Sequence, residues 1–167
     1  QGCSPQGYSW SHPWEAGGID PDGSLRPEYL DRLARILDKA DELGMVPMLG
    51  LFYFGQDQRI RDQEAVRAAV VNSVDWVVEK GYRHVLMEIG NEVDVPMYTH
   101  DIIKVDRCHE LIELVKTRSS GRLDTPAQRL LVSTSLKGGT IPPDSIVSVS
   151  DFILLHGNGQ GHPDLIR

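Results

Sequence analysis

The sequence has few cysteines, no long apolar run and no signal-like start. Cys3 and Cys108 are the only two cysteines, too few for a disulfide framework and without the spacing of a zinc site, so we expect ordinary thiols. No apolar stretch reaches the roughly 18 residues of a membrane span. No basic region followed by an apolar one marks a signal peptide. We therefore expect no membrane partner.

Basic residues are also scarce relative to acidic ones. The chain has 17 Lys and Arg against 24 Asp and Glu, a net charge of -7. This balance disfavours nucleic acid as a partner and suits a neutral substrate. At 167 residues the chain is long enough for one core. We expect a single domain over residues 1–167 that opens with a loop-rich segment, residues 1–26, where Gly and Pro interrupt any periodicity. Because the sequence begins at Gln1 rather than Met, we expect a piece of a longer protein.

After this segment, helical patterns alternate with apolar runs. Apolar residues recur at helical spacing over residues 30–40, 66–77 and 102–115. Pro27 fits the first turn of the first helix, and the three patterns stop at Gly44, Gly81 and Gly121. The strand-like runs cover residues 45–54, 84–89, 130–135 and 151–155. Residues 142–150 indicate one irregular helical turn.

This alternation predicts βαβ units and a parallel sheet. Three of the apolar runs lead into polar or Gly-rich segments, residues 55–57, 90–94 and 156–159. In parallel barrels the active-site groups come from the C-terminal ends of several strands. A dinucleotide-binding sheet instead needs a G-x-G-x-x-G turn after its first strand, and the sequence lacks one there. We therefore predict an α/β fold that is part of a (β/α)8 barrel, with about four parallel strands and flanking helices.

The apolar run 84–89 leads directly into Gly90-Asn91-Glu92. A carboxylic acid that protonates a glycosidic oxygen needs partly apolar surroundings, because desolvation favours its protonated form. An Asn beside it can bond the 2-hydroxyl of the sugar, and this contact strengthens in the transition state. An isolated Asn-Glu pair would more often be an exposed turn, since most Glu side chains face water. The wider pattern favours the catalytic interpretation.

That pattern is a family resemblance. The segment from Glu88 to Glu92 resembles the fourth strand of clan A glycoside hydrolases, in particular the family 5 cellulases and mannanases. Residues 151–156 are similar to the sixth strand, which often carries a His near the catalytic centre, and residues 43–51 resemble the third helix-to-strand junction. The resemblance covers about residues 26–159. It implies a retaining hydrolase of β-linked sugars without cofactor or metal, in which Glu92 is the general acid/base.

The sequence also departs from the family. The nucleophile of the family is a Glu at the end of the seventh strand, which we expect to lie outside the printed sequence, as do the first strand and most of the second. We therefore expect this chain alone to be inactive or barely active. The sixth-strand His of the family is often followed by an aromatic residue, whereas His156 is followed by Gly157-Asn158-Gly159.

Several further residues are candidates for substrate binding. They are Asn91, His156, Asn158, Gln56, Trp10 and Trp14. The two tryptophans either stack on sugar rings or pack beneath loops. His156 bonds the substrate or the nucleophile, or is a loop histidine satisfied by backbone groups.

Glu88 is the other carboxylate of this strand. In an extended strand it points the same way as Glu92 but lies ~13 Å from it. Because both glycosidase mechanisms need carboxylates within about 5–9.5 Å, we interpret Glu88 as an interior polar residue that needs a partner.

Two other functions remain open at this stage. One is a non-catalytic half-barrel that binds sugar or serves as structure, and the other is a parallel α/β metal-dependent hydrolase. For either, four parallel strands would leave two open edges and an uncovered inner face. Such surfaces promote pairing, so we expect a homo-oligomer, with two copies related by a two-fold axis.

Overall fold

The computed structural model describes residues 17–157 of the chain. In chain order these residues form α2 (Pro27–Glu42), β1 (Met48–Tyr53), α3 (Gln63–Glu79), β2 (Leu86–Asn91), α4 (Cys108–Ser119), β3 (Leu131–Ser133), β4 (Ser135–Leu136), α5 (Asp144–Val147) and β5 (Leu154–Leu155). Two short 3-10 helices, η1 (Asp57–Arg59) and η2 (Asp101–Ile103), follow β1 and β2. No helix in the described part of the chain is long and apolar enough to cross a membrane.

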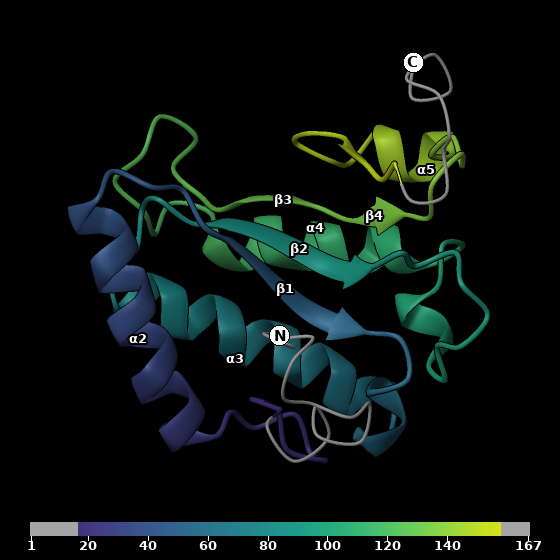
Figure 1. Ribbon diagram of the computed structural model, residues 1–167, viewed down its shortest axis with the longest axis horizontal. Helices are drawn as coiled ribbons and strands as arrows, with labels where there is room; N and C mark the ends of the chain where they lie inside the picture. The colour runs from purple at the N-terminus through teal and green to yellow at the C-terminus, as the bar shows by residue number, and fades with distance from the viewer. Residues whose placement is uncertain (1–16, 158–167) are drawn as a thin grey trace.

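Every pairing between these strands is parallel, as the sequence predicts. β1, β2 and β3 form one sheet in chain order, and β4 pairs with β5. Only Thr134 separates β3 from β4, so a single segment pairs with β2 at its start and with β5 at its end. Helices α3, α4 and α5 connect the successive strands (Figure 1). Within residues 17–157 the strands do not close into a barrel.

The helix boundaries follow local signals for two of the three long helices. Pro27 is at the first turn of α2, and Gly44 follows its end with φ 66. The side chain of Asp62 caps α3 by accepting a hydrogen bond from the backbone N–H of Ala65. Such caps satisfy amides that have no partner within the helix.

The third helix differs from the prediction, because α4 begins at Cys108 rather than near Ile102. Ile102 and Ile103 belong to η2, and the next residue, Lys104, has an extended backbone. Both isoleucines are fully buried. The apolar spacing in this region therefore reflects burial of a loop under the core rather than one continuous helix.

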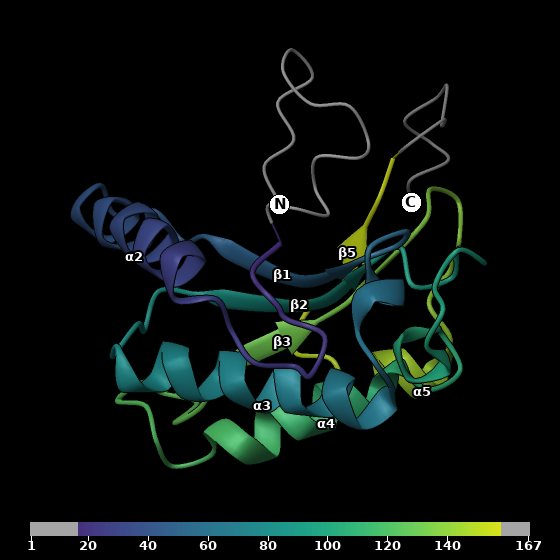
Figure 2. The same ribbon diagram turned by 90° about the horizontal axis from the view of Figure 1, so that it is seen from below.

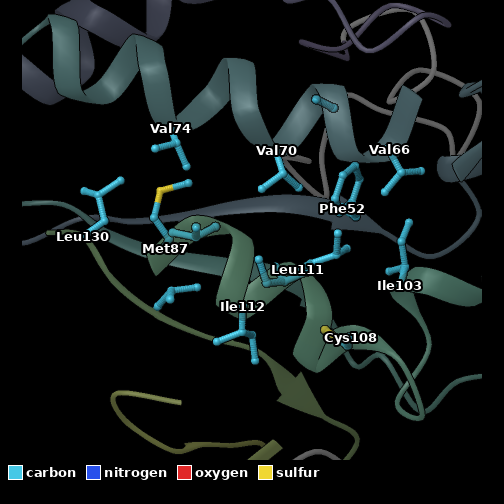
Figure 3. Packing of buried hydrophobic residues seen from close by; sticks show 14 of the residues in the cluster. Phe52, Val66, Val70, Val74, Met87, Ile103, Cys108, Leu111, Ile112 and Leu130 are labelled. Carbon is cyan, nitrogen blue, oxygen red and sulfur yellow. The ribbon is translucent and has the colours of Figure 1, made fainter. Parts of the chain in front are cut away.

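Helices α3 and α4 cover the same face of the sheet. Figure 2 shows both helices below the strands, and Figure 3 shows Val70 and Val74 of α3 and Leu111 of α4 around Met87 of β2. These side chains are fully buried. Cys108 lies in the same core as a free thiol, and burial raises its pKa to about 12. This agrees with an ordinary buried thiol, whereas Cys3 lies outside the described residues.

Candidate active site

Glu92 follows the last residue of β2 directly and is buried, with 9% of its surface exposed. Its backbone has φ 52, in the left-handed region that residues with a Cβ rarely adopt. This conformation costs roughly 1–2 kcal/mol in a non-glycine residue. Other contacts must therefore hold the strand end in place, as is typical of functional sites.

Ser135 of β4 provides two of these contacts. The backbone N–H of Glu92 donates to Ser135 Oγ at 3.0 Å, and the N–H of Val93 donates to the Ser135 carbonyl oxygen at 3.0 Å. Ser135 is fully buried. Ser135, on the neighbouring segment, thus holds the backbone at the point where Glu92 leaves the strand.

The carboxylate of Glu92 contacts an imidazole from another strand. His156 Nδ1 lies 2.8 Å from Glu92 Oε1. His156 follows β5, which reaches this position because it pairs with β4. The two sequence candidates are therefore brought together, and the imidazole is neither a distant loop group nor one satisfied by backbone alone. This contact holds the side chain of Glu92 at the C-terminal ends of the strands.

Asn91 is the last residue of β2, in register with Tyr53 of β1. Its carbonyl oxygen accepts a hydrogen bond from the hydroxyl of Tyr98 at 2.7 Å. Tyr98 is buried, so it packs beneath the loop that follows β2 and does not present its ring at the surface. This hydrogen bond holds the backbone of Asn91, the residue before Glu92.

Glu88 has the partner that its interior position requires, because Ser135 Oγ donates a hydrogen bond to Glu88 Oε1 at 2.5 Å. Burial raises the pKa of Glu88, and the charge of Glu92 adds to this; the Ser135 bond and the charge of His156 act in the opposite direction. β2 ends at Asn91, and Glu92 departs from the extended backbone of the strand.

Gln56 lies just before η1. It lines a hollow of about 750 Å³ between α2 and β1, together with Tyr29, Trp76 and Glu88. Neither Glu92 nor His156 lines this hollow. The structure therefore places Gln56 at the end of a strand, as the sequence predicts, but not beside the predicted acid/base.

Two other carboxylates that follow strands stabilise loops. Asp57 Oδ2 accepts hydrogen bonds from the backbone N–H groups of Thr99 and His100 at 2.7 and 3.0 Å. Asp94 accepts one from the N–H of Lys137 at 2.8 Å. These bonds tie the loops after β1, β2 and β4 to one another.

The remaining candidates, Asn158, Trp10 and Trp14, lie outside the described residues. Among residues 17–157, no three His, Cys, Asp or Glu side chains gather closely enough to hold a metal ion. Sequence reasoning missed Ser135. The signal available was the run Ser133-Thr134-Ser135, which is unusually polar for the end of a buried strand.

No protein family, no curated protein and no solved structure was found to match this chain.

Proposed function

We propose that the chain is the central part of a retaining glycoside hydrolase that acts on β-linked sugars, with Glu92 as the general acid/base. The observation that carries the proposal is the position of Glu92. It is a buried carboxyl at a strand end, on a left-handed backbone, and it contacts an imidazole from a second strand. A side chain held in this way at a strained position is a frequent feature of catalytic groups.

The strand order supports a further part of the proposal, that these residues belong to a (β/α)8 barrel. β1, β2 and β3 lie side by side in chain order, and β4 and β5 continue that order. The helices that link the first three strands, α3 and α4, pack on one face (Figure 2). In a doubly wound sheet the strand order reverses and helices cover both faces, whereas a barrel keeps chain order with all helices outside.

The chemistry divides between groups in this chain and one group that we propose lies outside it. Glu92 in its acid form gives its proton to the glycosidic oxygen as the bond to the sugar breaks, while the nucleophilic carboxylate bonds to the anomeric carbon. Glu92, now ionised, then removes a proton from the water that releases the sugar. Asn91 bonds the 2-hydroxyl, and His156 orients the carboxyl of Glu92. Asp57 and Asp94 support loops and take no part.

The test is Glu92→Gln in the protein that carries this chain, with Glu113→Gln on the exposed side of α4 as the matched control. Turnover should fall by about 10²- to 10⁴-fold on an unactivated β-linked oligosaccharide, the usual contribution of a general acid. Loss on a dinitrophenyl β-glycoside should be much smaller in the bond-breaking step, because that leaving group departs without a proton. The control should behave as the wild type.

Near-normal hydrolysis of the unactivated substrate by Glu92→Gln would show that Glu92 is not the general acid/base. Saturable binding of oligosaccharide without turnover by the wild type would instead favour a non-catalytic sugar-binding protein.

A further inference from the structure

A chain of hydrogen bonds links Glu88, Ser135 and the backbone of Glu92. Ser135 Oγ donates to Glu88 Oε1 at 2.5 Å and accepts from the N–H of Glu92 at 3.0 Å. We infer that Ser135 and Glu88 are positioning residues that hold Glu92 in its working orientation. This inference rests on the proposed acid/base role of Glu92 and adds to it the groups through which the fold controls that residue.

The direction of the Ser135 hydroxyl is set by Glu88. A serine hydroxyl has one proton to donate, and an ionised carboxylate can only accept. Once the proton of Ser135 points at Glu88, the lone pairs of Ser135 Oγ face the amide of Glu92. Glu88 therefore acts on Glu92 through Ser135, although the two glutamates are on the same strand segment.

The same serine holds the turn by a second bond, from the N–H of Val93 to its carbonyl oxygen. Two consecutive amides are thus bound by one fully buried residue. This arrangement fixes the left-handed conformation at Glu92, which would otherwise relax towards a common backbone conformation. The carboxyl then faces His156 rather than continuing along the strand.

Glu88 is an unfavourable choice if its role is only to stabilise the fold. Burial raises its pKa, which means that its surroundings disfavour the charged form. Its neighbours in the sheet register are Gly50 and Ser133, and no basic side chain among the described residues forms a salt bridge with it. A half-buried acid with a serine as its partner is better explained by the orientation it gives to Ser135.

The experiment compares Ser135→Ala and Glu88→Gln with Ser133→Ala, a buried serine two residues earlier whose Oγ donates only a long bond, 3.4 Å, to the Thr134 carbonyl. Amide hydrogen exchange at Glu92 and Val93 reports the turn, and kcat and KM on an unactivated β-linked oligosaccharide report its use. Ser135→Thr, which keeps the hydroxyl, tests for rescue.

We expect faster exchange at Glu92 in Ser135→Ala and Glu88→Gln. We also expect kcat to fall on the order of 10- to 100-fold with little change in KM, as small misplacements of a reacting group do. Ser135→Thr should recover part of kcat. Adding Glu88→Gln to Ser135→Ala should have no further effect, because the serine carries the influence of Glu88.

Two results would overturn the inference while the proposed function stands. One is unchanged amide hydrogen exchange in both Ser135→Ala and Glu88→Gln. The other is unchanged kcat in both of these variants. Either result counts when Glu92→Gln is inactive in the same assay. If Glu92→Gln keeps full turnover, the proposed function fails instead. If Ser135→Ala does not fold, Glu88→Gln, which is close to isosteric, decides on the same two readouts.

Discussion

The two faces of the sheet differ sharply in what they carry. On the face against α3 and α4, Met87, Ile89 and Val132 are each 0% exposed and belong to the hydrophobic core. On the other face, Glu88 lies in register with Gly50 and Ser133. The first face provides the burial that stabilises a domain, whereas the second carries Glu88, whose hydrogen bond with Ser135 leads to the backbone of Glu92. Apolar and polar side chains thus alternate along the same strand.

The amino and carboxyl ends of the strands also differ in the residues they carry. At the amino ends, the row formed by Met48, Leu86 and Leu131 crosses the three strands in register and is apolar. At the carboxyl ends, Asn91 is the last residue of β2, Glu92 follows it, and His156 follows β5. This gradient matches parallel sheets in which catalytic groups occupy only the carboxyl edge.

The largest effect on stability is expected on the helix-covered face. Ile89→Ala should lower the free energy of unfolding by about 2–5 kcal/mol, because a fully buried aliphatic side chain is lost and the packed helices cannot refill the space. Met48→Ala, at a position that is 40% exposed on the other face, should lower it by less than about 1 kcal/mol. Urea unfolding of both variants measures the difference. Equal losses would mean that the two faces are equally packed in solution.

A second prediction concerns the exposed apolar row. Met48 and Leu131 are 40% and 37% exposed, and we propose that a second copy of the chain packs on them to form a homodimer. Light scattering at micromolar concentration should give twice the mass of the chain. Met48→Lys combined with Leu131→Lys should reduce this mass to that of one chain, because two charges in the row cannot be buried without partners.

If the variant with both lysines still associates, the two copies contact each other through another surface. A strictly monomeric wild type would contradict the prediction.

The sequence predicted the fold well where the signal is local. The apolar runs and their glycine stops depend on residues close in the chain, and their alternation with helices indicated the parallel pairing; all appear in the structure. The position of Glu92 at a strand end followed from the same signals. The extent of the third helix was wrong, because the burial of Ile102 and Ile103 in a loop mimics helical spacing.

The partners of Glu88 and Glu92 could not be predicted in this way. Ser135 lies 43 residues from Glu92 and 47 from Glu88, and its contact depends on the register between β2 and the segment that carries β3 and β4. Register depends on packing across the whole sheet. The need for a partner at Glu88 followed from its predicted interior position, but the identity of that partner did not.

The smallest expected effect, and the one that most directly separates function from stability at this site, is the pH dependence of Glu88→Gln. Burial raises the folded-state pKa of Glu88 above its ordinary value of 4.5. The folded protein therefore retains a proton over a pH range in which the unfolded chain has lost it. The stability that this proton confers is fully present below the ordinary value and is lost as the pH rises through the folded-state pKa.

Glutamine has no proton to lose, so the stability of Glu88→Gln relative to the wild type should increase as the pH rises through the folded-state pKa of Glu88. The free energy of unfolding, measured with urea at several pH values, gives this difference directly, and Glu113→Gln on the exposed side of α4 is the matched control. The charges of His156 and Glu92 both act on Glu88, in opposite directions, so His156→Gln should enlarge the effect by removing the group that favours ionised Glu88. A relative stability that falls with pH would mean that ionised Glu88 stabilises the fold. Glu88 would then belong with the structural side chains of the sheet, and its connection to Ser135 would need no functional explanation.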